Sequence, residues 1–323
     1  MTTTHVHNKF LNIILNCYNL IKPLSILIAI SGGKDSLCLI KLIEDFNHLY
    51  NHYNNIDYIY IDHQIRSDSK QNIKHLINYL SKTNHKIYIY QIHEVNISES
   101  FMRQIRYQII LKHAIKHQKQ IIFTAHSQTD QLETFLLNLF RGTGLEGLSS
   151  LPIIRKVTNY INIIRPLTKI NKEDIIWFCH KFNLPIWNDK TNFYYKSYRN
   201  RIRNELLPYL KEYFNPKIEK SIINFLNLSA IENEYIKQNA IKLYLASRHS
   251  YYIAINLKTI KNQHLALQKR VINIFFYYNF NKYLKNKILY ELIKYINIPY
   301  KRKKIIMLEN FLINIEKDWI YIT

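Results

Sequence analysis

Short apolar runs alternate with amphipathic segments over about the first 205 residues of the chain. The runs are five or six residues long and rich in β-branched and aromatic residues, as strands are. The segments between them repeat apolar residues at helical spacing, as Leu39, Ile43 and Phe46 do. Strands that alternate with helices build parallel sheets, so the pattern predicts an α/β fold with a five-stranded, mainly parallel sheet. The predicted strands are residues 26–30, 57–61, 87–92, 121–125 and 161–165, and the predicted helices are residues 35–50, 71–83, 99–118 and 128–140.

The alternation stops near residue 207, and basic, tyrosine-rich segments with helical periodicity follow over residues 216–296. Residues 305–322 then alternate apolar and polar positions about a turn at Glu309 and Asn310, which predicts a short β-hairpin. We therefore expect an α/β domain, a smaller helical domain, and a basic segment that carries the hairpin. Their expected bounds are 1–207, 208–300 and 301–323.

The chain carries 45 Lys and Arg against 23 Asp and Glu, a net charge of +22. Such an excess favours a polyanionic partner, either a nucleic acid or an anionic membrane. The membrane is disfavoured because no apolar stretch reaches the ~18 residues of a spanning helix. Cys17, Cys38 and Cys179 are odd in number and far apart, which fits neither a disulfide framework nor a zinc site. Abundant Ile, Asn, Lys and Tyr indicate an A+T-rich genome, which accounts for part of the charge.

All five glycines fall in two places, at Gly32-Gly33 and within residues 142–147. The first pair lies in Ser-Gly-Gly-Lys-Asp-Ser at residues 31–36, after a predicted strand and before a predicted helix. A glycine turn that leads into a helix N-terminus is a ready site for an anion. A Walker A loop would need glycine in place of Ile28 and Ser or Thr in place of Asp35, and a dinucleotide-binding fingerprint would need a third spaced glycine. Neither motif is present.

The motif SGGxDS resembles the pyrophosphate-binding loop of the PP-loop ATP pyrophosphatases. That resemblance implies a PP-loop fold and cleavage of ATP between its α and β phosphates. The cofactor-binding residues it implies are Ser31, Gly32, Gly33, Lys34, Asp35 and Ser36.

Further segments are similar, in chain order, to motifs of the tRNA(Ile)-lysidine synthase family. Met102 stands where the family's E-x-x-A-R-x-x-R-Y motif has a small residue, and Thr129 stands where AHxxDDQxET has its first aspartate. The second departure leaves Asp130 to act with Glu133 or Asp35. The similar segments are residues 61–66 (DHxLR), 99–107, 125–134, 141–148 (RGxGxxGL) and 165–167 (RPL), Asp189 with Asn192, and residues 199–208 (RNxIRxxLLP).

This resemblance implies a ligase that uses ATP and Mg²⁺ to join free L-lysine to the wobble cytidine of tRNA(Ile) with a CAU anticodon. Asp130 and Glu133 are three residues apart on a predicted helix and so share a face; they could hold Mg²⁺ or bind the incoming amine. The implied catalytic residues are Asp35, Arg106, His126, Asp130 and Glu133; the metal ligands are Asp35 and Asp130; and the tRNA-binding residues are Arg103, Arg199, Arg201 and Arg203.

Two alternatives stay open: another PP-loop tRNA-modifying enzyme, and an RNA-binding protein without catalysis. Thiolases of the superfamily depend on paired cysteines or bound clusters, which three scattered cysteines do not supply. Ser31, His126 and Asp130 do not suggest a hydrolase triad, because no G-x-S-x-G elbow surrounds a serine. The first 23 residues lack arginine, so we expect no transit peptide and place the protein in the plastid stroma, encoded there, with bacterial cytoplasm as the alternative. We expect no membrane association and no stable protein partner.

Overall fold

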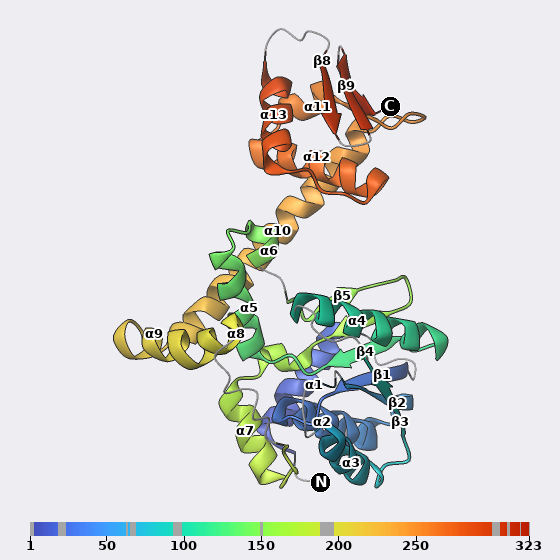
Figure 1. Ribbon diagram of the computed structural model, residues 1–323, viewed down its shortest axis with the longest axis vertical. Coiled ribbons are helices and arrows are strands. Elements are labelled where there is room, and N and C mark those ends of the chain that lie inside the picture. The colour runs from blue at the N-terminus through green and yellow to red at the C-terminus, as the bar shows by residue number, and fades with distance from the viewer. Residues whose placement is uncertain are drawn as a thin grey trace. The chain divides into compact units, whose positions relative to one another are not determined.

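The structure is a computed structural model that divides into two compact units, Met1–Ile223 and Asn224–Thr323 (Figure 1). The composition change that suggested a boundary lies at residue 207, whereas this division lies at residue 223. Each unit is described by itself below. The structure describes residues 3–18, 24–62, 64, 69–92, 99–148, 151–187, 197–298, 304–308, 311–316 and 318–322.

A six-stranded sheet forms the centre of the first unit (Figure 1). Its strands are β1 (Leu24–Ile30), β2 (Tyr53–Asp62), β3 (Lys86–Gln91), β4 (Ile121–Thr124), β5 (Ile154–Lys156) and β6 (Asn162–Ile164). They lie in the order β3-β2-β1-β4-β6-β5. The five predicted strands are confirmed and run parallel. The predicted number of strands was one too low, because β5 adds an antiparallel edge strand that is short, exposed and without an apolar pattern.

Helices cover both faces of this sheet. One face packs against the helices α1, α2, α3 and α7, and the other packs against α4. Successive residues of β1 show the two faces: Ile26 and Ile28 belong to the first core, whereas Leu27 packs with Ile110 and Ala114 of α4. Burial on both faces explains why the strand is a continuous apolar run. The helices up to this point are α1 (His5–Cys17), α2 (Lys34–Tyr50), α3 (Ser69–Leu80), α4 (Glu99–Lys116), α5 (Gln128–Phe140), α6 (Leu145–Leu148), the 3₁₀ turn η1 (Pro166–Lys169) and α7 (Lys172–Lys181).

The chain then forms one helical segment that contains a π turn. It consists of α8 (Tyr198–Arg201), η3 (Ile202–Leu206) and α9 (Leu207–Tyr213), and we call it the α8–α9 segment. The N–H of Leu207 donates to the carbonyl of Ile202, five residues back. Pro208 follows, and it has no N–H to donate to the carbonyl of Asn204, four residues before it. The loss of this α-helical hydrogen bond favours the wider π turn.

The second unit combines helices with a four-stranded antiparallel sheet in the order β7-β10-β9-β8. Where the sequence predicted a hairpin, β8 pairs with β9, and β10 and β7 extend the sheet. The turn at residues 309–310 and the basic residues 301–303 lie outside the described residues. Among the described residues, no helix is long and apolar enough to cross a bilayer. The elements are α10 (Ile218–Ser247), within which the division falls, β7 (Ala254–Asn256), α11 (Leu257–Lys261), α12 (Leu265–Phe280), α13 (Asn286–Asn297), β8 (Lys304–Leu308), β9 (Phe311–Glu316) and β10 (Trp319–Ile322).

Candidate active site

The glycine pair makes a tight turn between β1 and α2. Gly32 has a φ of 80°, which L side chains rarely adopt. A Cβ on Gly32 would also collide with the side-chain oxygen of Asn72. Asn72 lies on α3 and donates from Nδ2 to the carbonyl of Ser31 at 3.3 Å, while the N–H of Ser31 donates to Oγ of Ser36 at 3.0 Å. The turn is therefore held by side chains beneath it as well as by its own backbone.

The N-terminus of α2 follows this turn and suits an anion. Gly33 is its N-cap and has no side chain, so no side chain caps the first amides of the helix. These N–H groups and the positive end of the helix dipole favour negative charge at the same place. Lys34 is the first residue of the helix and adds a positive charge. This arrangement can bind the phosphates of a nucleotide.

Two carboxylates lie close enough to repel each other beside the turn, Asp35 on α2 and Asp130 on α5. Burial raises the pKa of Asp35 to about 6, and the negative charge of Asp130 adds to the rise. Asp130 Oδ2 accepts from the N–H of Ser127 at 2.9 Å and from its Oγ at 3.1 Å, and this capping box fixes the carboxylate at the start of α5. Two fixed carboxylates that repel each other are suited to a cation.

Mg²⁺ fits this pair, because it binds proteins through one or two carboxylates while water and substrate phosphates complete its shell. Within the described parts of the chain, no group of three or more His, Cys, Asp or Glu side chains could hold a metal. Asp35 and Asp130 could hold such an ion together with phosphate oxygens.

Glu133 lies one turn further along α5 and is completely buried. Arg203 Nε donates to its Oε1 at 2.6 Å, and Arg199 Nε lies 3.2 Å from its Oε2. Burial raises the pKa of Glu133, and Arg203 opposes that rise. Thus the α8–α9 segment is joined to α5 by a carboxylate between two guanidinium groups.

A second group of positive charges comes from α4. Burial lowers the pKa of Arg106, and the nearby charges of Arg103 and Arg199 lower it further. His126 follows β4, and its pKa falls to about 3, mainly because of burial. It is therefore neutral at physiological pH, and its Nδ1 lies 3.0 Å from the hydroxyl of Thr124. This histidine can share a hydrogen bond but does not serve as a cation.

Arg165 directly follows β6 and is almost fully buried. It donates to the carbonyl of Pro152 at 3.0 Å and to the hydroxyl of Tyr107 at 3.4 Å. Burial raises the pKa of Tyr107, but Arg165 and the arginines of α4 outweigh that effect and lower it overall. The site is therefore electropositive on the α4 side and acidic between α2 and α5.

The structure brings most of the predicted site residues together and separates one. Arg201 turns away from Glu133 and pairs with Glu205 on the surface at 3.0 Å. Thr129, in the place of the usual first aspartate, is buried and offers no charge. Sequence reasoning missed Asn72, which no motif marks, and Lys172, whose positive charge partly opposes the rise in the pKa of Asp35. His63, Arg66, Asp189 and Asn192 lie outside the described residues.

Comparisons with known proteins show the family to which the chain belongs. The family model described as a PP-loop domain matches residues 2–210. The tRNA(Ile)-lysidine synthase, chloroplastic, of Gracilaria tenuistipitata var. liui is 71% identical over 322 residues, which cover 100% of both chains. The chain belongs to the tRNA(Ile)-lysidine synthase family. Other members of that family are the chloroplastic enzyme of Pyropia yezoensis, 34% identical over 98% of this chain and 95% of its own, and the tRNA(Ile)-lysidine synthase of Nostoc sp., 37% identical over 76% of each chain.

Among solved structures, the U34-tRNA thiolase NcsA from Methanococcus maripaludis, with its [4Fe-4S] cluster, has a TM-score of 0.57 and 17% identity. The match covers 69% of this chain and 77% of that one, and it shows a shared fold. In the present chain all three cysteines are free, with Cys38 and Cys179 buried and Cys17 partly buried. Although they are far apart in the sequence, Cys38 and Cys179 meet in a side-chain hydrogen bond.

Proposed function

We propose that the chain uses ATP to adenylate the wobble cytidine of tRNA(Ile) with a CAU anticodon, and then replaces AMP with lysine to form lysidine. Membership of the PP-loop family implies the use of ATP. The full-length relative at 71% identity supports this substrate pair, and the names of that relative and of the Pyropia protein support the chloroplast as the location. The observation that carries the proposal is the paired acidic residues beside an open helix N-terminus.

In the first step, the 2-carbonyl oxygen of cytidine attacks the α-phosphorus of ATP, and the bond to the β-phosphate breaks to release pyrophosphate. The amides at Gly33 and Lys34, with the helix dipole, stabilise the negative charge that moves onto the leaving group. Mg²⁺ bound at Asp35 and Asp130 would neutralise phosphate charge during this step. Arg106 and Arg103 supply the positive charge on the α4 side, where the tRNA backbone needs neutralising.

In the second step, the ε-amine of lysine adds to C2 of the cytidine, the bond between C2 and oxygen breaks, and AMP leaves. The ammonium must lose a proton first, and a neighbouring carboxylate can accept it. We assign the ammonium to Asp130, whose Oδ1 has Arg203 no nearer than 3.9 Å. Glu133 is already bound by two guanidinium groups, so we assign it to positioning Arg199 and Arg203.

The test uses the purified full chain, labelled lysine, ATP, Mg²⁺ and two transcripts that share the CAU anticodon, tRNA(Ile) and tRNA(Met). The proposal expects lysine incorporation into tRNA(Ile) alone, with one pyrophosphate and one AMP released per lysine. Binding of tRNA without pyrophosphate release would indicate the non-catalytic alternative. Without lysine the proposal allows at most one pyrophosphate per tRNA, from the first step. Repeated pyrophosphate release without lysine, with another change to the base, would indicate a different tRNA-modifying PP-loop enzyme.

A further inference from the structure

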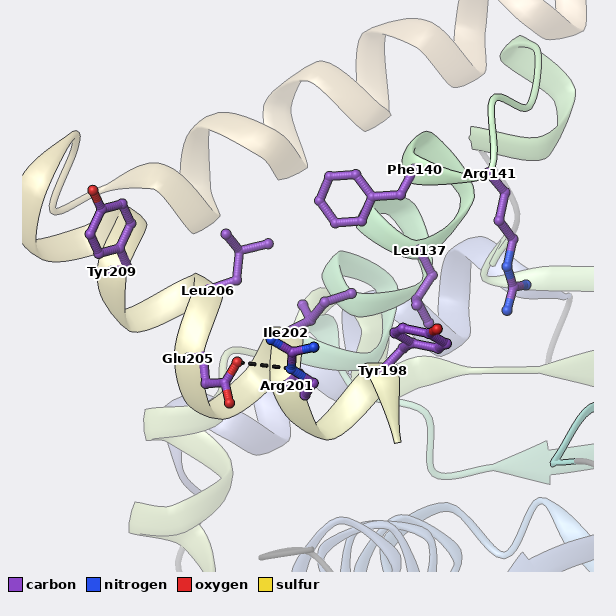
Figure 2. Close-up of a pocket in the computed structure, with 9 residues that line it drawn as sticks. All are labelled: Leu137, Phe140, Arg141, Tyr198, Arg201, Ile202, Glu205, Leu206 and Tyr209. Atoms are coloured by element: carbon purple, nitrogen blue, oxygen red, sulfur yellow. Dashed lines mark hydrogen bonds and ion pairs between the residues drawn. The ribbon is translucent and has the colours of Figure 1, made fainter. Parts of the chain in front are cut away.

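An open groove of about 680 Å³ lies between the C-terminal end of α5 and the α8–α9 segment (Figure 2). Its volume is within the ~300–1,000 Å³ of ligand pockets. Three aromatic side chains line it and remain largely in solvent: Tyr198 is 74% exposed, Phe140 64% and Tyr209 52%. Large apolar side chains gathered on one exposed surface mark a binding site more often than scattered ones do.

The groove adjoins the candidate active site through the same two elements. Leu137 lines it and lies four residues after Glu133, about 6 Å along the helix. On the other wall, Tyr198, Ile202 and Tyr209 face the groove, whereas Arg199 and Arg203 of the same segment reach Glu133. A polymer with one residue at the carboxylates could therefore place a neighbouring residue in the groove.

The charge of the groove suits a polyanion. Arg141 and Arg201 are among its lining residues, and Figure 2 shows Arg201 paired with Glu205 at the surface. An exposed pair of this kind contributes little to stability, so Arg201 can exchange Glu205 for a phosphate at small cost. Flat aromatic rings beside arginines are the usual elements of sites that bind unpaired nucleotides. Free lysine suits the groove poorly, because Glu205 is its one carboxylate and is already paired.

We propose that this groove binds unpaired nucleotides of the tRNA next to the modified cytidine, with one base stacked on Tyr198 and a further base on Tyr209. The two rings lie eleven residues apart on the α8–α9 segment, about 16 Å along a helix, so they hold separate bases. This inference rests on the proposed function. It adds a stacking site that holds the anticodon loop while the cytidine reaches Asp35 and Asp130. Arg141 and Arg201 would contact phosphates of the bound nucleotides.

The experiment compares the full chain with a Tyr198→Ala/Tyr209→Ala variant in binding and lysine incorporation on tRNA(Ile). A stacked base contributes about 5- to 150-fold in affinity, so we expect KM for tRNA to rise at least fivefold while kcat at saturating tRNA changes less than twofold. Tyr198→Phe/Tyr209→Phe keeps the rings and should behave as the parent does. Tyr160→Ala is the matched control, because Tyr160 is 83% exposed in the same unit and outside the groove.

A transcript with 2-aminopurine beside the wobble cytidine reports stacking directly. Its fluorescence should be quenched on binding to the parent and to the Phe variant, and should stay unquenched with the Ala variant. Parent-like KM and quenching in the Ala variant would overturn the inference, as would an equal loss in the Phe variant. If the parent chain itself makes no lysidine, the proposed function fails instead, so the two failures are distinguishable.

Discussion

Replacement of Glu133 by alanine should destabilise the first unit by about 2–3 kcal/mol. Removing one partner of a buried ion pair costs about 3–5 kcal/mol, because the remaining charge stays without compensation. The arginine side chains here are 23% and 30% exposed, so water compensates them in part and the cost falls to the lower bound of that range or somewhat below it. Glu133→Gln keeps an acceptor for Arg203 and should cost about 1–2 kcal/mol. Urea unfolding, followed by tryptophan fluorescence, measures both differences.

Glu219→Gln is the control for this series, because Glu219 pairs with Lys211 at 2.8 Å on the surface of the same unit. That pair should contribute about 0–1 kcal/mol. In activity assays, Glu133→Gln should slow adenylation and lysine transfer together, since both steps use arginines that Glu133 holds. Accumulation of adenylated tRNA in this variant would refute the reasoning and restore Glu133 as the group that binds the amine. A loss of stability no larger than that of Glu219→Gln would refute the structural part.

Three further changes test the site and its support. Asp35→Asn should abolish pyrophosphate release in the assay with tRNA and lysine but leave tRNA affinity within about twofold in a filter-binding assay; unchanged turnover would contradict the assignment of the metal site. Gly32→Ala should destabilise the chain and weaken ATP protection against thermal unfolding, because its Cβ meets Asn72 at a positive φ; a parent-like melting curve with and without ATP would contradict this. Burial lowers the pKa of His113 to about 4. Between pH 6.5 and pH 4, His113 is therefore protonated in the unfolded chain but not in the folded one. The contribution of this residue to stability should be complete above pH 6.5 and should fall by up to about 3 kcal/mol as the pH is lowered to 4. His113→Gln should flatten this fall in urea titrations, replacement of the exposed His48 by Gln should not, and an equal slope in both would contradict the cause.

The sequence predicted the parts of the fold that repeat a simple pattern. Strands such as β1 are buried on both faces, so their apolar runs were visible without a structure. The helix α1 was not predicted, although Thr4 and His7 form a capping box at its start. His7 is an unusual residue for that box, so the signal did not match the common Ser/Thr-x-x-Glu pattern. β5 was not predicted because its three residues are exposed and show no apolar pattern. It is a strand only because it pairs with β6.

The site was predictable where chemistry demands a motif and less so where packing decides. The glycine turn carries the motif SGGxDS, so its residues stand out in the chain. Asn72 supports that turn from a different helix, and nothing in its own segment marks it as more than a polar residue of α3. Arg199 and Arg203 were predicted to contact tRNA, but they are four residues apart on one helical face, and that face turns toward Glu133.

The two faces of the α8–α9 segment lead to a separation that kinetics can detect. Its inner face carries Arg203 to the carboxylates, while its outer face carries Tyr198 and Arg201 to the groove. If this division of roles holds, substitutions on the inner face change kcat, whereas substitutions on the outer face change KM for tRNA. The π turn at Ile202 offsets the residues after it from the regular helical positions, so the groove face and the inner face depend on the same turn. Pro208→Ala restores the missing N–H and should therefore disturb rate and affinity together, unlike a change on either face alone.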